Sequence, residues 1–332
     1  MRKEVQVISV IIIVGIIIAS TGYYLYLTQT AERETLVVST TTSLYDTGLL
    51  DQMKDVYESV NNRVILAFIS AGTGIALENA KRGDADMILV HSPSQELGFM
   101  QEQYGVNRKI FAYNFFTIVG PPDDPVKVLD LDPLLALEAI LEHGRVNGNP
   151  IWVSRDDASG TNTKEIGLWT AAGYNYSEIS EENWFISSGT GMGTTLNLAD
   201  EQGFYTLSDI GTFLKYKVDG LIELDQMVDE GQSLLNVYSA IAVNRATVTN
   251  VKFEVAMEFI QWLVGSQAQD LIESYGQESY GASLFFPAVD ILESHLPAQT
   301  YQWIQGYAFF DSGGTLYECP PALRSGEFGI YP

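Results

Sequence analysis

The chain has 332 residues with 42 acidic and 18 basic side chains, a formal net charge of −24, and 46% hydrophobic residues. A chain this acidic repels nucleic acid and anionic lipid headgroups, which excludes nucleic acid as an expected partner. The apolar content suffices for a sizeable core, and the length exceeds that of one typical domain, so two lobes are expected.

The N-terminal segment differs in kind from the rest. No charged side chain occurs in residues 5–31, which follow Arg2 and Lys3. A cleaved signal peptide has an apolar region of roughly 7–15 residues, whereas a membrane-spanning helix needs about 20, a length that this run reaches if it extends through Leu27. We therefore expect segment 1–31 to be a transmembrane anchor rather than a cleaved signal helix. In either case the body of the protein lies on the outer face of the cytoplasmic membrane, anchored or secreted.

Strand and helix patterns alternate after this segment. In the first block, strand-like runs occur at 36–39, 64–69, 87–90 and 115–119, and helical spacing occurs at 49–60 and 75–81. In the second block, helices at 134–142, 163–172, 194–201 and 210–217 alternate with extended runs at 151–153, 184–187 and 204–207. A β-rich run at 237–243 and a long amphipathic helix at 253–264 follow.

This alternation predicts an α/β fold with two lobes. We expect residues 35–115 plus 238–332 to form lobe one and residues 116–237 to form lobe two. The chain then crosses between the lobes near Phe115 and again near Tyr238.

Three turns in the first block share one design. Each follows a predicted strand and leads into a helix or turn, at 39–43, 70–74 and 91–93. The carboxyl ends of parallel strands are where open α/β sheets bind ligands, and hydroxyl groups and free amides there supply donors without a formal charge. One such turn is usually an ordinary helix cap, but three at successive strand ends indicate an anion-binding edge.

The second block adds a turn with a cation. Residues 154–161 read Ser-Arg-Asp-Asp-Ala-Ser-Gly-Thr, and Arg155 is the one Lys or Arg among the candidate turns. Its planar guanidinium suits oxyanions, because it donates two parallel hydrogen bonds. The alternative is that Arg155 only pairs with Asp156 or Asp157. A glycine-rich turn at 188–195 also precedes a helix, which alone is weak evidence for a site.

These turns belong to a longer set of motifs that resembles the tungstate-binding proteins of ABC importers. The similarity is nearly continuous from about residue 36 to 287, and it rests on the segments 40–43, 46–51, 72–74, 83–86, 89–93, 104–108, 118–121, 153–161, 168–169, 191–193 and 196–197. The resemblance implies a two-lobed periplasmic-binding-protein fold, type II-like, that closes on the anion. It also implies an ABC permease and an ATPase as partners.

The same resemblance implies the ligand and its contacts. The expected ligand is tungstate, or molybdate as a closely similar oxyanion, and the alternative is a phosphate- or molybdate-binding ABC transporter component. In this family the opening Thr/Ser motif, the second Gly-Thr-Gly turn and the Ser-Arg segment line the cleft. The predicted ligand-binding residues are therefore Thr41, Thr42, Ser43, Thr73, Arg155, Ser159 and Thr161. No cofactor and no bound metal cation are expected.

An enzyme and a membrane-anchored interaction module are the alternatives to a transport protein. The sequence lacks two signatures of enzymes. Ser159 is not part of a Gly-x-Ser-x-Gly motif, which carries the nucleophile in α/β-hydrolases. The three histidines, His91, His143 and His295, lack the i,i+4 spacing of a metal-binding pair on a helix. A membrane-anchored interaction module would bind no small ion. We therefore expect no enzyme. The C-terminal extension, 288–332, departs from the family pattern, and the sequence leaves open whether it is surface cover or a transporter contact.

Overall fold

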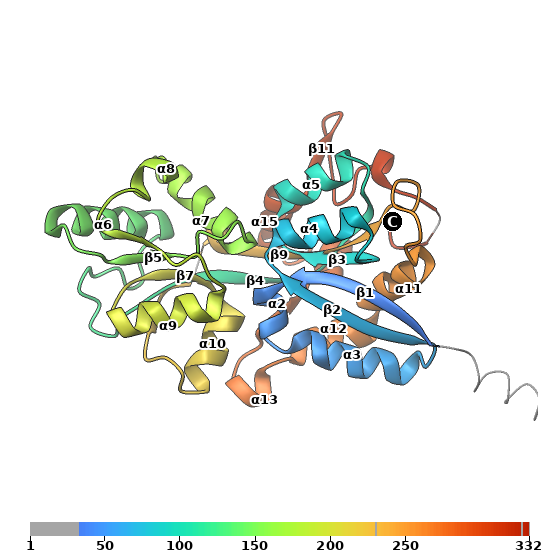
Figure 1. The fold of residues 1–332 in the computed structure, drawn as a ribbon, viewed down its shortest axis with the longest axis horizontal. Coiled ribbons are helices and arrows are strands. Elements are labelled where there is room, and N and C mark those ends of the chain that lie inside the picture. The colour runs from blue at the N-terminus through green and yellow to red at the C-terminus, as the bar shows by residue number, and fades with distance from the viewer. Residues whose placement is uncertain (1–32, 230, 327, 332) are drawn as a thin grey trace, which may run out of the picture.

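The computed structural model of the chain describes residues 33–229, 231–326 and 328–331. These residues form two bodies (Figure 1). We call the body that contains β1 (Glu34–Thr41) the first lobe and the body that contains β5 (Trp152–Ser154) the second lobe. The predicted N-terminal anchor lies outside the described residues. Within the ranges given above, no helix is both long enough and apolar enough to cross a bilayer.

The first lobe is built on parallel strands. β1 pairs in parallel with β2 (Val64–Ala71) and with β3 (Met87–Val90). The helices that pack on this sheet are α3 (Leu49–Val60), α4 (Thr73–Arg82), α5 (Pro93–Gln101) and α11 (Phe253–Leu263). Alternate residues of β3 face opposite sides: Met87 and Leu89 pack with α3 and α11, whereas Ile88 and Val90 pack with α4 and α5. Burial on both faces explains why this strand is uniformly apolar in the sequence.

One strand belongs to both lobes. β4 (Gly105–Gly120) pairs with β9 (Leu235–Val243) along its first part, and with β7 (Thr206–Asp209) and β8 (Asp225–Val228) at its end. The main sheet has the order β2-β1-β3-β9-β4-β10, in which β10 is Phe286–Pro287. The predicted lobe boundaries fall inside β4 and β9, and the domain limits stay a prediction.

The strand predicted at 115–119 is too short, because β4 begins at Gly105. The first half of β4 contains Arg108 and Lys109, so its sequence does not show the apolar pattern of a buried strand. Charged residues are rarely buried unless they are paired. Both are paired in the fold. Arg108 Nε lies 2.7 Å from Glu96 Oε2, and Lys109 Nζ lies 2.9 Å from Glu318 Oε2.

The second lobe contains a short parallel pair, β5 with β6 (Phe185–Ser187). Its helices are α6 (Pro133–Asn147), α7 (Gly160–Ala171), α8 (Tyr176–Ile179), α9 (Met192–Gln202) and α10 (Ile210–Val218). The core of this lobe holds Trp152, Trp169 and Trp184, and the ring of Trp169 meets the other two edge to face. This geometry is favourable for aromatic rings and adds to the gain from burying them.

The C-terminal part packs on the first lobe and on the crossing strands. Its elements are α12 (Ser266–Ser274), α13 (Gln277–Tyr280), α14 (Val289–Ser294), α15 (Ala298–Ala308), β11 (Phe310–Ser312) and β12 (Thr315–Tyr317). Within the extension, Ile304 and Ala308 of α15 are fully buried with Ile110 of β4 and Val237 of β9. The extension is therefore part of the packed structure around these strands.

A buried carboxyl group links β5 to α7. Glu165 is 2% exposed, and its oxygens lie 2.7 Å from Trp152 Nε1 and 2.6 Å from Ser154 Oγ. Burial raises the pKa of Glu165 from 4.5 to about 7, although these hydrogen bonds oppose the shift. A higher pKa in the folded chain means that the folded state binds the proton more tightly. The tighter binding of this proton by Glu165 therefore adds to the free energy of unfolding below pH 4.5, and this contribution is lost as the pH rises through about 7.

Glu165→Gln is expected to remove this part of the pH dependence. The amide has nearly the same shape, and its oxygen accepts from Trp152 while its nitrogen donates to Ser154 Oγ, with no charge to bury. We expect thermal unfolding between about pH 5 and pH 8 to show a smaller loss of melting temperature than in the parent. Exposed Glu201 in the same lobe supplies the control Glu201→Gln, which keeps the parent slope. A parent-like slope in Glu165→Gln would mean that this carboxyl group is ionised in the fold.

Candidate anion-binding site

The predicted turns of the first lobe lie at the carboxyl ends of its parallel strands. Thr41 ends β1 and caps α2 (Thr42–Asp46), where its Oγ1 accepts a hydrogen bond from Leu44 N at 3.3 Å. Thr73 begins α4 after β2, and Ser92 precedes α5 after β3. The strand-to-helix connections therefore bring hydroxyl groups to one edge of the sheet.

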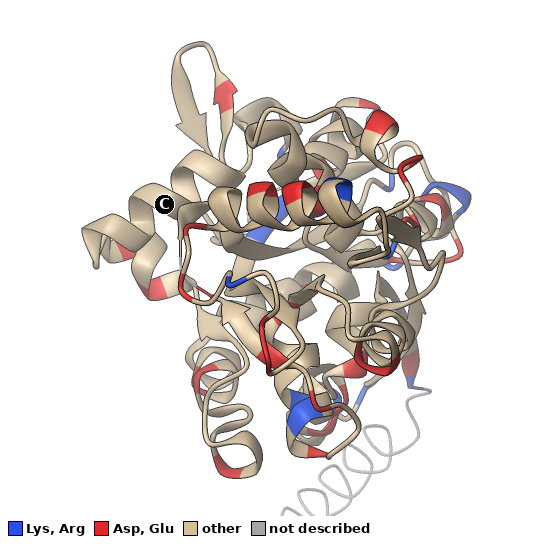
Figure 2. Cartoon of the chain, turned by 90° about the vertical axis from the view of Figure 1, so that its left-hand side faces the viewer, with Lys and Arg blue, Asp and Glu red and all other residues tan. Residues whose placement is uncertain are grey.

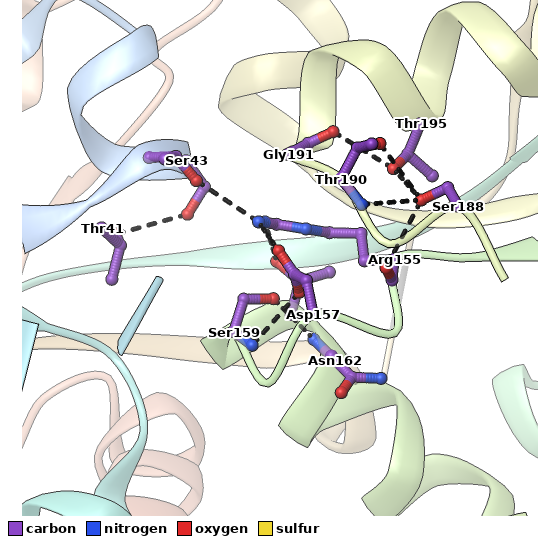
Figure 3. Close-up of polar contacts among 12 residues, drawn as sticks. Thr41, Ser43, Arg155, Asp157, Ser159, Asn162, Ser188, Thr190, Gly191 and Thr195 are labelled. Carbon is purple, nitrogen blue, oxygen red and sulfur yellow. Dashed lines mark hydrogen bonds and ion pairs between the residues drawn. The ribbon is translucent and has the colours of Figure 1, made fainter. Parts of the chain in front are cut away.

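Arg155 meets this edge from the second lobe (Figure 3). It follows β5 and is 2% exposed. Its Nη2 lies 3.3 Å from Thr42 Oγ1 of the first lobe, and its Nη1 lies 3.4 Å from Thr161 Oγ1 of α7. Ser159 caps α7, because its Oγ accepts a hydrogen bond from Asn162 N at 3.1 Å. One guanidinium thus lies between hydroxyl groups of both lobes.

Arg155 is also paired with an acid from its own turn. Its Nη2 lies 2.5 Å from Asp157 Oδ2, and Asp157 Oδ1 accepts a hydrogen bond from Ser159 N at 3.2 Å. Of the two pairings that the sequence left open, the one with Asp157 is formed. The pair does not satisfy the whole guanidinium, since Arg155 Nε and Thr73 Oγ1 are buried without a hydrogen-bond partner among the described residues. Buried donors that lack an acceptor within the protein are the groups that an anion satisfies.

The two lobes touch close to this point. Lys215 Nζ donates to Asp46 O at 2.9 Å across the junction. A Cβ added to Gly160 of α7 would lie 2.7 Å from Cε1 of His91 in the first lobe. Only a glycine permits this approach of the two lobes.

Acidic groups around the junction are held by hydrogen bonds and by cations. Asp209 is fully buried and caps α10, where its Oδ1 accepts a hydrogen bond from Thr212 N at 2.8 Å. Burial raises the pKa of Asp209 to about 6, while these hydrogen bonds and the charge of Arg155 oppose the shift. Burial likewise raises the pKa of Asp46 against the attraction of Lys215 and Arg155. Further acidic residues are spread over the described chain (Figure 2), so an anion must be held by short-range donors.

Lys164 of α7 is another buried cation, and it is engaged by other groups. Lys164 Nζ donates to Leu235 O at 2.8 Å and lies 4.1 Å from the centroid of the Tyr307 ring. Burial lowers the pKa of Lys164 to about 7. With Ser92 and Tyr307 it lines a cavity of about 390 Å³ that also reaches His91 and Gly160. Arg155 is therefore the cation that the hydroxyl-rich turns surround.

The structure brings the residues predicted from the sequence to this junction of the lobes, namely Thr41, Thr42, Ser43, Thr73, Arg155, Ser159 and Thr161. Thr73 lies at the junction because the preceding residue, Gly72, lies against the Asp157 turn of the second lobe. A Cβ added to Gly72 would lie 3.7 Å from Asp157 O. Their role in binding stays a prediction.

Sequence reasoning missed the groups that support Arg155 from its own lobe. Ser188 Oγ donates to Arg155 O at 3.4 Å and lies 2.8 Å from Thr195 Oγ1 (Figure 3). The turn at 188–195 acquires this position because β6 pairs with β5, with Ser187 opposite Ser154. Over the part of the chain that the structure describes, no three side chains are grouped to hold a metal ion.

Two lobes, shared crossing strands and hydroxyl-rich turns at strand ends are the architecture of an extracytoplasmic solute-binding protein. A family model described as a PBP superfamily domain matches residues 28–267. Tungstate-binding protein TupA of Peptoclostridium acidaminophilum is 38% identical over 78% of this chain and 87% of its own length. The solved structure of the tungstate ABC transporter from Geobacter sulfurreducens is 37% identical, has a TM-score of 0.65, and is matched over 73% of this chain and 99% of its own.

TupA from Desulfovibrio alaskensis G20 is 35% identical with a TM-score of 0.64, matched over 76% of this chain and 98% of its own. The chain belongs to the PBP superfamily and, within it, to the family of the tungstate-binding proteins. The predicted family and the predicted α/β periplasmic-binding-protein fold are confirmed, whereas the predicted N-terminal helix lies outside the described residues.

Proposed function

We propose that this protein captures tungstate between its lobes, outside the cytoplasm, and delivers it to an ABC permease and its ATPase. The observation that carries the proposal is the buried Arg155, whose Nε lacks a hydrogen-bond partner among residues 33–229, 231–326 and 328–331. Hydroxyl groups of both lobes, Thr42 and Thr161, surround it. The tungstate-binding relatives support the identity of the ligand.

A tetrahedral dianion without protons suits this set of groups. At neutral pH tungstate offers only acceptors, whereas phosphate still carries a proton and needs an acceptor from the protein. The carboxylate of Asp157 has a donor on each oxygen, Arg155 on one and Ser159 N on the other. We expect these contacts to keep Asp157 turned toward Arg155 and Ser159 N rather than toward a proton of phosphate. Molybdate has the same charge and nearly the same size, so a molybdate-binding component is the alternative.

Delivery of the anion requires a membrane complex. The proposal includes an ABC permease and an ATPase as partners and attachment to the outer face of the membrane through the uncharged run 5–31. It includes no catalytic step, in keeping with tungstate-binding relatives that are transport proteins.

Calorimetric titration of the purified protein tests the ligand. We expect tungstate to bind and molybdate to compete with it, while excess phosphate and sulfate at fixed salt do not. Sulfate is smaller and cannot reach every donor of a site set for tungstate, and each missed donor is costly. Displacement by phosphate at a comparable concentration would show that a carboxylate faces the ligand and would replace tungstate with phosphate as the function.

Arg155→Ala is expected to weaken tungstate binding roughly 10- to 100-fold, because a hydrogen bond to a charged group contributes about 1.5–3 kcal/mol. Arg155→Lys should recover only part, since a point charge replaces a planar fork. The double variant Arg155→Ala/Asp157→Asn measures how much of the loss comes from the carboxylate left beside the dianion. If Arg155→Ala binds tungstate as tightly as the parent, Arg155 is only a structural partner of Asp157 and not a ligand-binding residue.

Gly160→Ala is expected to prevent full closure on the anion. Its methyl group would lie 2.7 Å from the His91 ring, whereas an added Cβ at Gly167 in the same helix meets nothing within 4 Å. With saturating tungstate, small-angle scattering should show compaction in the parent and in Gly167→Ala, and less of it in Gly160→Ala. If tungstate compacts none of the three proteins, the ligand does not bridge the lobes.

A further inference from the structure

His91 is a buried histidine at the contact between the lobes. It is 1% exposed, and its ring lies 4.9 Å from the Tyr238 ring and 6.1 Å from the Phe116 ring, measured between centroids. Burial lowers the pKa of His91 to about 4, while a hydrogen bond with Asn236 opposes the shift. The ring is therefore neutral at pH 7, and only one of its two nitrogens carries a proton.

A chain of hydrogen bonds decides which nitrogen that is. The main-chain oxygen of Leu284 can only accept, so Asn114 Nδ2 donates to it at 3.2 Å and Asn114 Oδ1 points the other way. Asn236 Nδ2 then donates to Asn114 Oδ1 at 2.9 Å and to Tyr238 Oη at 2.8 Å. The oxygen of this amide, Asn236 Oδ1, is thereby left to face His91 Nδ1 at 2.8 Å. Because that oxygen can only accept, Nδ1 carries the proton of His91.

The second nitrogen of the ring must then accept. His91 Nε2 lies 3.2 Å from Ser43 Oγ, so the hydroxyl proton of Ser43 points at His91. A serine hydroxyl has one proton, and in this arrangement it is committed inside the first lobe. Thr41 Oγ1, 3.4 Å from Ser43 Oγ, then acts as donor to Ser43 rather than as acceptor.

Four other predicted hydroxyl groups differ from Ser43 and Thr41 in this respect. Thr42 and Thr161 accept from Arg155, and Ser159 accepts from Asn162 N. Thr73 Oγ1 has no partner among the described residues. The hydroxyl protons that remain free to donate to an anion are those of Thr42, Thr73, Ser159 and Thr161.

We propose that His91 is a positioning residue of the anion site: it takes the hydroxyl proton of Ser43, fixes the turn after β1, and leaves hydrogen bonding of the anion to the neighbouring hydroxyl groups. The inference rests on the proposed function, since it assigns donors for the same ligand. It divides the seven predicted residues by role. Ser43 orients the turn, whereas Thr42, on the same turn, donates to the anion.

Nitrogen NMR of histidine reads the tautomer directly. The chain has three histidines, so protein labelled with ¹⁵N only in histidine gives a simple spectrum, and His91→Gln identifies the signals of His91. We expect the shifts of a neutral ring protonated on Nδ1 in the free full-length protein at pH 7 and unchanged with saturating sodium tungstate. A ring protonated on Nε2, in either state, would overturn the proposal. The free-protein spectrum is informative even if tungstate does not bind, so failure of the proposed function is seen separately.

Affinity for tungstate gives the second readout. Thr42→Val removes a hydrogen bond to the anion and should weaken binding at least about tenfold, whereas Ser43→Ala should cost only about threefold, through the orientation of the turn. His91→Gln keeps an acceptor near Ser43 and should bind more tightly than His91→Leu, which has none. Melting temperatures of all four variants check folding. A loss in Ser43→Ala as large as in Thr42→Val, or equal affinities of His91→Gln and His91→Leu, would contradict the assigned role.

Discussion

A guanidinium buried between two lobes must have its charge matched, because transfer out of water costs several kcal/mol for an unpaired ion. Asp157 matches Arg155 within the second lobe at 2.5 Å, so the pair carries no net charge. A dianion bound as we propose would therefore gain little from net charge, and it would depend on dipoles: hydroxyl groups and the main-chain N–H groups at the start of α7. Such a site does not depend on a positive surface, and it is compatible with a net charge of −24.

Apolar patterning in the sequence located β3 correctly but placed the beginnings of α4 and α7 too late. β3 lies at 87–90 as predicted, because a strand buried on both faces is apolar throughout. α7 was predicted from residue 163 and begins at Gly160, and α4 was predicted from residue 75 and begins at Thr73. The first turns of these helices are made of small and polar residues that show no apolar period, and those same turns form the candidate site.

The family resemblance identified the candidate site residues, and the structure shows which groups each of them contacts. No spacing along the chain indicates that Ser188 supports the main chain of Arg155, since that contact follows from the pairing of β5 with β6. The direction of the hydrogen bond from Ser43 to His91 depends on two asparagines of the crossing strands, Asn114 and Asn236, which lie 122 positions apart. Such long-range polar contacts are not readable from a single sequence.

The ion pair between Lys109 and Glu318 has a consequence for how the protein is made. Its partners are 209 positions apart, and Lys109 is almost fully buried in the strand that both lobes share. A chain that has not yet been synthesised as far as Glu318 holds Lys109 without its carboxylate, so burial of this lysine is unfavourable until nearly all of the polypeptide is present.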